Sequence, residues 1–447
     1  MEIKLGFTEK EITSWAGMSF VKRFIERMDF GSILNNSDLP KQNSNRGYQP
    51  QQLIENFLVG MWCGATKFEH LEVTRQDKVM GEIFEWKRMP GHKSFQRYFR
   101  KFNCAINKRV FTQLYQWFFR KVQFDKFTLD LDSSILTRYG EQEGAKIGYN
   151  KDKKGRKSHH PLMAFIADCK MVANFMLRSG DAYTSNNMYS FLEDTLERLE
   201  GKKIGLLRAD SGFFDTEIME YLEDPTVSIS YVISAKLYQP IKRDILSDKV
   251  WIEESDGIYL SELEYKSPNW NKPRRLVIVK QNITKHPKAT GKKLGKTIET
   301  TGRLFEDENI YNNYRYSCYV TNLDLPASSV WHLYNKRGDA ENRIKELKYD
   351  FGFDSFNLKE FYATEAALNF VMMGYNIMSL FRQIILNTDK FQRMPTLRYK
   401  LFGKGGFIVK NGSEKILKLS VKMKDRKWIR GLWGNSKEYE LPFLVQN

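Results

Sequence analysis

The sequence is poor in the residues that cross-link chains or bind zinc. Only four cysteines and six histidines occur among its 447 residues. The cysteines lie far apart, and no histidine joins them at zinc-ligand spacing, so neither a disulfide framework nor a zinc finger is supported. We therefore expect a reducing, cytoplasmic compartment. The four positions are Cys63, Cys104, Cys169 and Cys318.

Long hydrophobic runs are also missing. The N-terminal segment carries charges throughout and does not have the pattern of a secretory signal. The most apolar stretch, residues 366–381, is only about 16 residues long and contains Asn369 and Asn376. We expect a buried core helix there rather than a membrane span, and no membrane partner.

Acidic residues are in the minority. The chain has 71 lysines and arginines against 54 aspartates and glutamates, a net charge of +17. Such a surplus indicates a polyanionic partner, nucleic acid or an anionic membrane, and disfavours an enzyme for neutral small molecules. The surplus is concentrated in residues 391–447, where 13 basic residues face four acids. This basic C-terminal region is expected to bind a polyanion.

The remaining composition is that of a folded protein of two to four domains, because 41% of its residues are hydrophobic and 14% aromatic. Residues 1–122 have helical spacing and predict a helical, DNA-binding N-terminal domain. Residues 123–235 and 317–390 predict two parts of one α/β core, a mixed five-stranded sheet with helices whose order matches an RNase H-like fold. Residues 236–316 have short alternating stretches broken by turn signals and predict a β-rich insertion domain.

Aspartates stand at the ends of two predicted strands. In the segment LDLDSS, Asp130 and Asp132 point to one face of a strand, and Asp210 follows an apolar run in LLRADSGF. Each could be a turn former or a helix cap. Together they predict a site for divalent metal ions, because clustered carboxylates repel one another unless cations neutralise them.

A third carboxylate is needed to complete a two-metal site. Glu341, in the segment YNKRGDAENRIKELK, is the best candidate because a helix there could present it to the sheet. Glu346 is the nearby competitor. Asp339, Glu341 and Glu346 could instead be solvated and paired with Lys345 and Lys348.

Four residues of this segment have the spacing of the Tyr-Arg-Glu-Lys signature of a large group of bacterial insertion-sequence transposases: Tyr334, Arg337, Glu341 and Lys348. The segments LDLDSS and RADSGF also resemble, in order, the first and second aspartate motifs of these DDE transposases. The resemblance covers roughly residues 120–390, and the flanking domains more weakly. Gly338 is a departure, because glycine disfavours a helix and predicts a kink or a close approach of DNA.

The resemblance implies a role for each matching residue. Asp132 would be the first catalytic and metal-binding acid, with Asp130 as the alternative, Asp210 the second and Glu341 the third. They would hold two Mg²⁺ ions, with Mn²⁺ expected to substitute, and cleave DNA by phosphoryl transfer. The residues implied to grip DNA phosphates near the scissile bond are Tyr334, Arg337 and Lys348.

The resemblance further implies double-stranded DNA partners, namely the terminal inverted repeats of the element and the target DNA. Two subunits are expected to bring two ends together, and the 3′-hydroxyl ends would be joined to the target. Two alternatives stay open at this point. One is a DNA-binding regulator or domesticated derivative without strand transfer, and the other is an RNase H-like nuclease.

Overall fold

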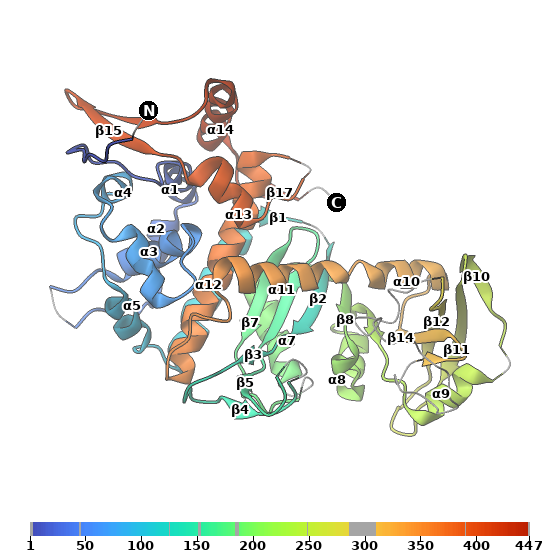
Figure 1. Cartoon of the computed structure of the whole chain (residues 1–447). Coiled ribbons are helices and arrows are strands. Elements are labelled where there is room, and N and C mark those ends of the chain that lie inside the picture. Colours follow the sequence, from blue (N-terminus) through green and yellow to red (C-terminus); the bar gives the residue numbers. More distant parts are fainter. Residues whose placement is uncertain are drawn as a thin grey trace.

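A computed structural model describes residues 3–43, 46–124, 126–150, 153–183, 187–247, 249–285, 310–388 and 390–445. Figure 1 shows a helical part at the N-terminal end, a long central sheet and a C-terminal part that returns to the first helices. One hydrophobic cluster runs from Met18 to Val445 and joins all three.

The N-terminal part is helical, as the sequence predicts. Its helices bury their apolar positions, and two of them begin at side-chain caps: Asn103 accepts from the backbone N–H of Ile106, and Asp77 from that of Met80. The helices are α1 (Met18–Arg27), α2 (Phe30–Asn36), α3 (Pro50–Trp62), α4 (Lys78–Ile83), α5 (His92–Phe99) and α6 (Cys104–Arg120), with a 3₁₀ turn, η1 (Phe68–Thr74).

The five strands expected for the core lie side by side in the order β7-β6-β2-β8-β9. Strand β2 pairs parallel with β8, and β8 pairs parallel with β9. Strand β6 pairs antiparallel with both of its neighbours, β2 and β7. The sheet is therefore mixed. These strands are β2 (Lys126–Ser133), β6 (Leu162–Ile166), β7 (Met171–Met176), β8 (Lys203–Ala209) and β9 (Ser230–Ser234).

The sheet continues beyond these five strands, because β14 pairs antiparallel with β9 and brings the strands of the predicted insertion with it. Among the described residues, the whole sheet has ten strands. Residues 286–309 of the predicted insertion lie outside the described residues. The added strands are β10 (Ile252–Ser255), β11 (Ile258–Tyr265), β12 (Arg274–Asn282), β13 (Ile310–Tyr311) and β14 (Tyr314–Thr321).

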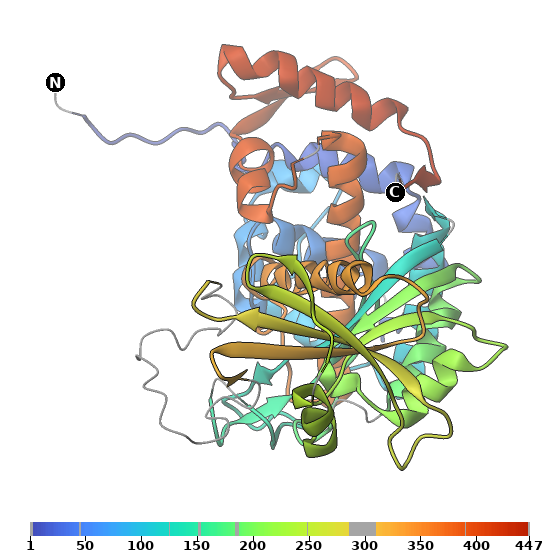
Figure 2. The same cartoon turned by 90° about the vertical axis from the view of Figure 1, so that its right-hand side faces the viewer.

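Helices cover both faces of the sheet (Figures 1 and 2). Helix α10 packs on one face of β9, β11 and β12 around a separate hydrophobic cluster, and α7 packs on β7. Two helices follow one another after β14, α10 and α11, linked by Lys336 and Arg337. The helices are α7 (Met188–Leu199), α8 (Thr216–Glu223), α9 (Gln239–Leu246), α10 (Ala327–Asn335) and α11 (Gly338–Phe351), with a 3₁₀ turn, η2 (Ser211–Phe213).

The most apolar stretch is the buried core helix that the sequence predicts, α12 (Phe361–Phe381). It packs between the N-terminal helices and β7. Its polar residues are explained by the backbone that they contact: Asn376 donates to the carbonyl of Val172 at 2.8 Å and accepts from the same residue's N–H at 2.7 Å. Within the described residues, no helix has the length and hydropathy needed to cross a membrane.

The C-terminal region packs on the first helices. Arg27 donates to the carbonyl of Tyr439 at 2.9 Å, and the rings of Phe20 and Trp433 meet edge to face. The elements here are η4 (Arg382–Leu386), α13 (Met394–Leu397), η5 (Arg398–Phe402), the hairpin β15 (Gly406–Asn411) and β16 (Glu414–Leu419), η6 (Met423–Asp425), α14 (Arg426–Glu438) and the pair β1 (Val122–Gln123) and β17 (Phe443–Leu444).

A small sheet follows β2, made of β3 (Leu136–Thr137), β5 (Lys157–His159) and β4 (Lys146–Ile147).

Candidate active site

Two of the predicted acids meet at one edge of the sheet because of strand register. Leu131 of β2 is paired with Ala209 of β8, and the two strands are parallel neighbours. The next residue in each case is an aspartate, Asp132 within β2 and Asp210 directly after β8, so both carboxylates lie at the same carboxyl edge. Asp210 also accepts from the N–H of Gly212 at 2.9 Å, which starts the 3₁₀ turn η2.

Arg337 lies between these two carboxylates. Its Nη2 is 3.1 Å from Oδ2 of Asp132 and 3.9 Å from Oδ2 of Asp210. The same Nη2 donates to the carbonyl of Leu131 at 3.1 Å. Lys336 and Arg337 keep right-handed helical dihedral angles between α10 and α11. The link therefore presents the guanidinium directly to the edge of β2.

Burial and the neighbouring charges together set the pKa of Asp132. Its side chain is 9% exposed, against 39% for Asp210. Burial raises the pKa of Asp132 to about 6, and the carboxylates of Asp210 and Glu341 add to this rise, while Arg337 opposes it. One guanidinium thus lies between two carboxylates, Asp132 and Asp210, so the edge keeps an excess of negative charge.

Glu341 is near this edge but is exposed to solvent. It lies in the first turn of α11, and its charge reaches Asp132 strongly enough to raise that residue's pKa. Within the described residues, no three His, Cys, Asp or Glu side chains are grouped closely enough to hold a metal ion. The donor set nevertheless suits a hard divalent cation, because all three side chains are carboxylates and their charge exceeds that of Arg337.

Tyr334 and Lys348 lie along the same edge of the sheet, on opposite sides of Asp132. Tyr334, at the end of α10, is hydrogen-bonded to Ser234 at the end of β9, and its ring lies 4.3 Å from that of Tyr319. Burial raises its pKa. Lys348 lies near the end of α11 and donates to the carbonyl of Ile135 at 3.2 Å, three residues after Asp132.

Two of the weighed acids lie in different surroundings. Asp130 is buried and receives a bidentate pair of bonds from Arg208, at 2.6 and 2.8 Å. Glu346, the competitor of Glu341, is 2% exposed and lies 2.7 Å from Arg382. Both are committed to internal ion pairs.

Arg208 is a residue of this region to which the sequence reasoning assigned no role. Besides holding Asp130, its Nη1 donates to the carbonyl of Leu333 at 2.7 Å. It thereby ties β2 and β8 to α10, the helix that carries Tyr334. The sequence does show a basic residue, Arg208, two positions before Asp210. Its pairing with Asp130 could not be predicted, because it depends on the register of β2 on β8.

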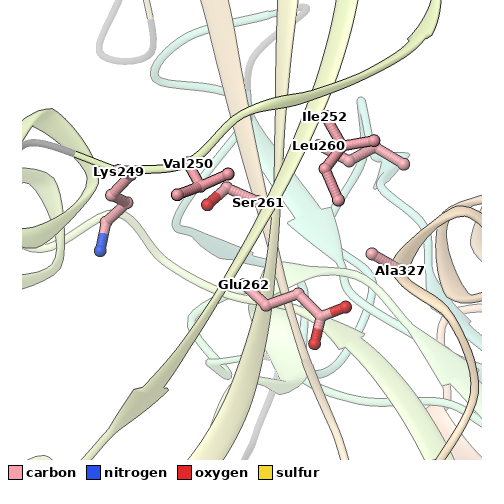
Figure 3. A pocket seen from close by; sticks show the side chains of 7 residues that line it. All are labelled: Lys249, Val250, Ile252, Leu260, Ser261, Glu262 and Ala327. Carbon is pink, nitrogen blue, oxygen red and sulfur yellow. The ribbon is translucent and has the colours of Figure 1, made fainter.

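A cavity of about 410 Å³ lies elsewhere, between β11, the segment that leads into β10 and the start of α10. Figure 3 shows apolar side chains of Val250, Ile252, Leu260 and Ala327 beside the carboxylate of Glu262. That carboxylate is 2.8 Å from Arg275 and is therefore neutralised. None of the predicted site residues lines this cavity.

Comparison with known families identifies the chain. The family model for the transposase DDE domain, group 1, matches residues 1–435. The chain belongs to this family. It is therefore a DDE transposase, an enzyme of DNA transposition, and enzymes of this family generally use divalent metal ions.

The other two comparisons add little to this identification. No curated protein matches the transposase significantly. Among solved structures, it is similar to the cryo-EM structure of a piggyBac transposase synaptic complex with hairpin DNA, with 12% sequence identity and a TM-score of 0.46. That similarity covers 88% of this chain and 82% of the other. A TM-score of this size is too low to relate the two folds element by element.

Proposed function

We propose that the transposase binds the terminal inverted repeats of an insertion sequence, cleaves the strands at the element ends and joins the 3′-hydroxyl ends to target DNA. The observation that carries the proposal is the placement of Asp132 and Asp210 next to the paired residues Leu131 and Ala209. This edge lies within a five-strand order that supports an RNase H-like core.

Asp132, Asp210 and Glu341 are the residues that would hold the divalent ions, for which Mg²⁺ is proposed and Mn²⁺ is the substitute. Bound there, the ions would activate the attacking oxygen and stabilise the leaving oxygen of the phosphodiester. Arg337 neutralises part of the charge of Asp132 and Asp210 and fixes their positions. Burial opposes the charge of this guanidinium, but Asp132, Tyr334 and Asp210 hold its pKa above the usual value.

Tyr334, Arg337 and Lys348 are proposed to contact DNA phosphates along α10 and α11. The support is their position, because all three follow the same edge from β9 past Asp132 to Ile135. Nε of Arg337 is buried and has no hydrogen-bond partner within the described residues. The helical N-terminal region and the basic C-terminal region are proposed to bind DNA further from the scissile bond, and two subunits to hold the two ends.

The test is a cleavage assay on a plasmid that carries the gene between its native flanks, with Mg²⁺ or Mn²⁺. Wild type is compared with Asp210→Asn and with the control Asp215→Asn, a partly buried N-cap of α8 that asparagine can replace. We expect metal-dependent cuts at the element ends from wild type and the control, and none from Asp210→Asn. Specific binding without cuts would favour a regulator, and cuts at random positions a plain nuclease.

A further inference from the structure

Residues 3–12, at the start of the described chain, form an exposed, extended arm. Its apolar side chains Ile3, Leu5 and Phe7 are 96%, 88% and 94% exposed. They occupy every second position, which is the pattern of a strand with one apolar face. Figure 2 shows this arm running away from the rest of the molecule.

The base of the arm is already paired to a strand. Thr13 and Gly406, the first residue of β15, exchange two backbone hydrogen bonds of 2.9 Å each, in the antiparallel sense. The hydroxyl of Thr13 also donates to Asp77 at 2.5 Å. The arm therefore leaves the molecule at the outer edge of the hairpin formed by β15 and β16, which projects from the helices in Figure 1.

This hairpin offers an edge and an apolar surface. Within the described residues, the outer edge of β15 is paired at Gly406 alone, so the backbone groups further along the strand lack a strand partner. Val409 and Ile416 lie directly opposite each other on the hairpin and are both exposed. A two-stranded hairpin is marginally stable by itself, and a third strand with a matching apolar face would stabilise it.

The hairpin of the same chain cannot cover the apolar residues of the arm. If the ladder continued from Thr13 and Gly406 in antiparallel register, Phe7 would face Gly412 in the hairpin turn. Leu5 and Ile3 would then extend past the end of the hairpin. The segment next to Thr13 is also held on its own chain, because Lys10 stacks 3.1 Å from the ring centre of Phe407 and Glu11 pairs with Lys78.

We propose that the arm of one subunit adds as a strand to the β15 edge of a second copy of this chain. Every copy carries both the arm and the edge, so two copies can exchange arms reciprocally around a two-fold axis. Ile3, Leu5 and Phe7 would then extend the apolar surface of Val409 and Ile416. The proposal concerns the contact between subunits and does not depend on the assignment of the catalytic residues.

The first test measures the oligomeric state of the full-length protein by sedimentation velocity over a concentration series. The double variant Leu5→Ser/Phe7→Ser changes two exposed side chains and should not affect folding, which circular dichroism checks. We expect wild type to dimerise and the variant to dimerise at least about tenfold more weakly. The control Val250→Ser/Ile252→Ser removes two exposed apolar residues at another place and should dimerise like wild type.

Three outcomes of this test would overturn the proposal. The first is a wild type that stays monomeric across the series, and the second is a dimer that the arm variant leaves unchanged. The third is a variant that loses affinity for DNA while its oligomeric state is unchanged, which would assign the arm to DNA instead.

The second test locates the contact by disulfide trapping in a Cys104→Ser background, since Cys104 is the exposed cysteine. Chains with Leu5→Cys are mixed with chains with Val409→Cys and oxidised. We expect a cross-linked heterodimer, and none when Ile252→Cys replaces Val409→Cys. If both cysteines are placed in one chain and the disulfide forms within that chain, the arm lies on its own hairpin and the proposal is wrong.

Discussion

Helix α11 carries two glutamates five residues apart that differ in charge balance. Glu341 is exposed, and its charge acts on Asp132, where Arg337 is the close cation. Glu346 is buried between Arg382, at 2.7 Å, and Arg343, at 3.8 Å. The comparison teaches that the excess of carboxylates over arginines, rather than the presence of an acid on the helix, distinguishes the candidate active site from an internal ion pair.

Strand β2 repeats this contrast two residues apart. Asp130 is matched one to one with Arg208, whereas Asp132 shares Arg337 with Asp210. Both aspartates are buried on the same face of the strand. Only Asp132 is close to further carboxylates at the open edge, so it is the aspartate of this pair that suits metal binding.

The largest expected effect is a loss of DNA cleavage when Glu341, but not its neutralised counterpart Glu346, loses its charge. Glu341→Gln should reduce cleavage of the element ends at least about a hundredfold, because a ligand of the divalent ions is lost. Its free energy of unfolding should change by less than about 0.5 kcal/mol, because the side chain is exposed. Cleavage rates and urea unfolding check this, and near-normal turnover would contradict the assignment of Glu341.

The matching change in the internal cluster should act on stability. Glu346→Gln leaves Arg382 and Arg343 buried without their carboxylate and should lower the free energy of unfolding by about 3–5 kcal/mol. Urea unfolding measures this, and adding Arg382→Met should recover part of the loss. If Glu346→Gln were fully stable but unable to cleave DNA, Glu346 rather than Glu341 would be the third catalytic acid.

The pH dependence of stability should report the difference between Asp132 and an ordinary aspartate. Because burial raises the pKa of Asp132 to about 6, the folded state binds its proton more tightly than the unfolded chain does. The proton on Asp132 therefore stabilises the folded state below about pH 4. This stabilisation is lost as the pH rises through about 6, which lowers the free energy of unfolding by about 3 kcal/mol. Unfolding without divalent ions should show this slope in wild type and a flatter one in Asp132→Asn, and parallel curves would refute it.

The smallest expected effect concerns the far end of the edge. Lys348→Ala should weaken binding to the element ends by about tenfold or less, because it removes one proposed phosphate contact. Fluorescence anisotropy at two salt concentrations should show a reduced salt dependence. Lys345→Ala, an exposed lysine on the same helix, is the matched control, and equal binding by both variants and wild type would remove Lys348 from the DNA contacts.

The amino-acid sequence was sufficient for the features that depend on neighbours along the chain. The periodicity of apolar residues predicted the N-terminal helices, the strands that carry Asp132 and Asp210, and the buried helix α12, because each pattern follows from one face of one element. The motifs with their spacing were sufficient for the family. The roles of the individual site residues remain predictions.

Tertiary structure alone decided which charged groups meet. The register of β2 on β8 brings Asp132 beside Asp210 and Asp130 beside Arg208, and packing of α11 on α12 brings Glu346 to Arg382. The joining of the insertion strands to the central sheet was likewise unpredicted, because strand pairing depends on residues distant in the sequence. A charge pattern along a chain does not contain these distances, and the distances determine whether a carboxylate is neutralised internally or left to bind a cation.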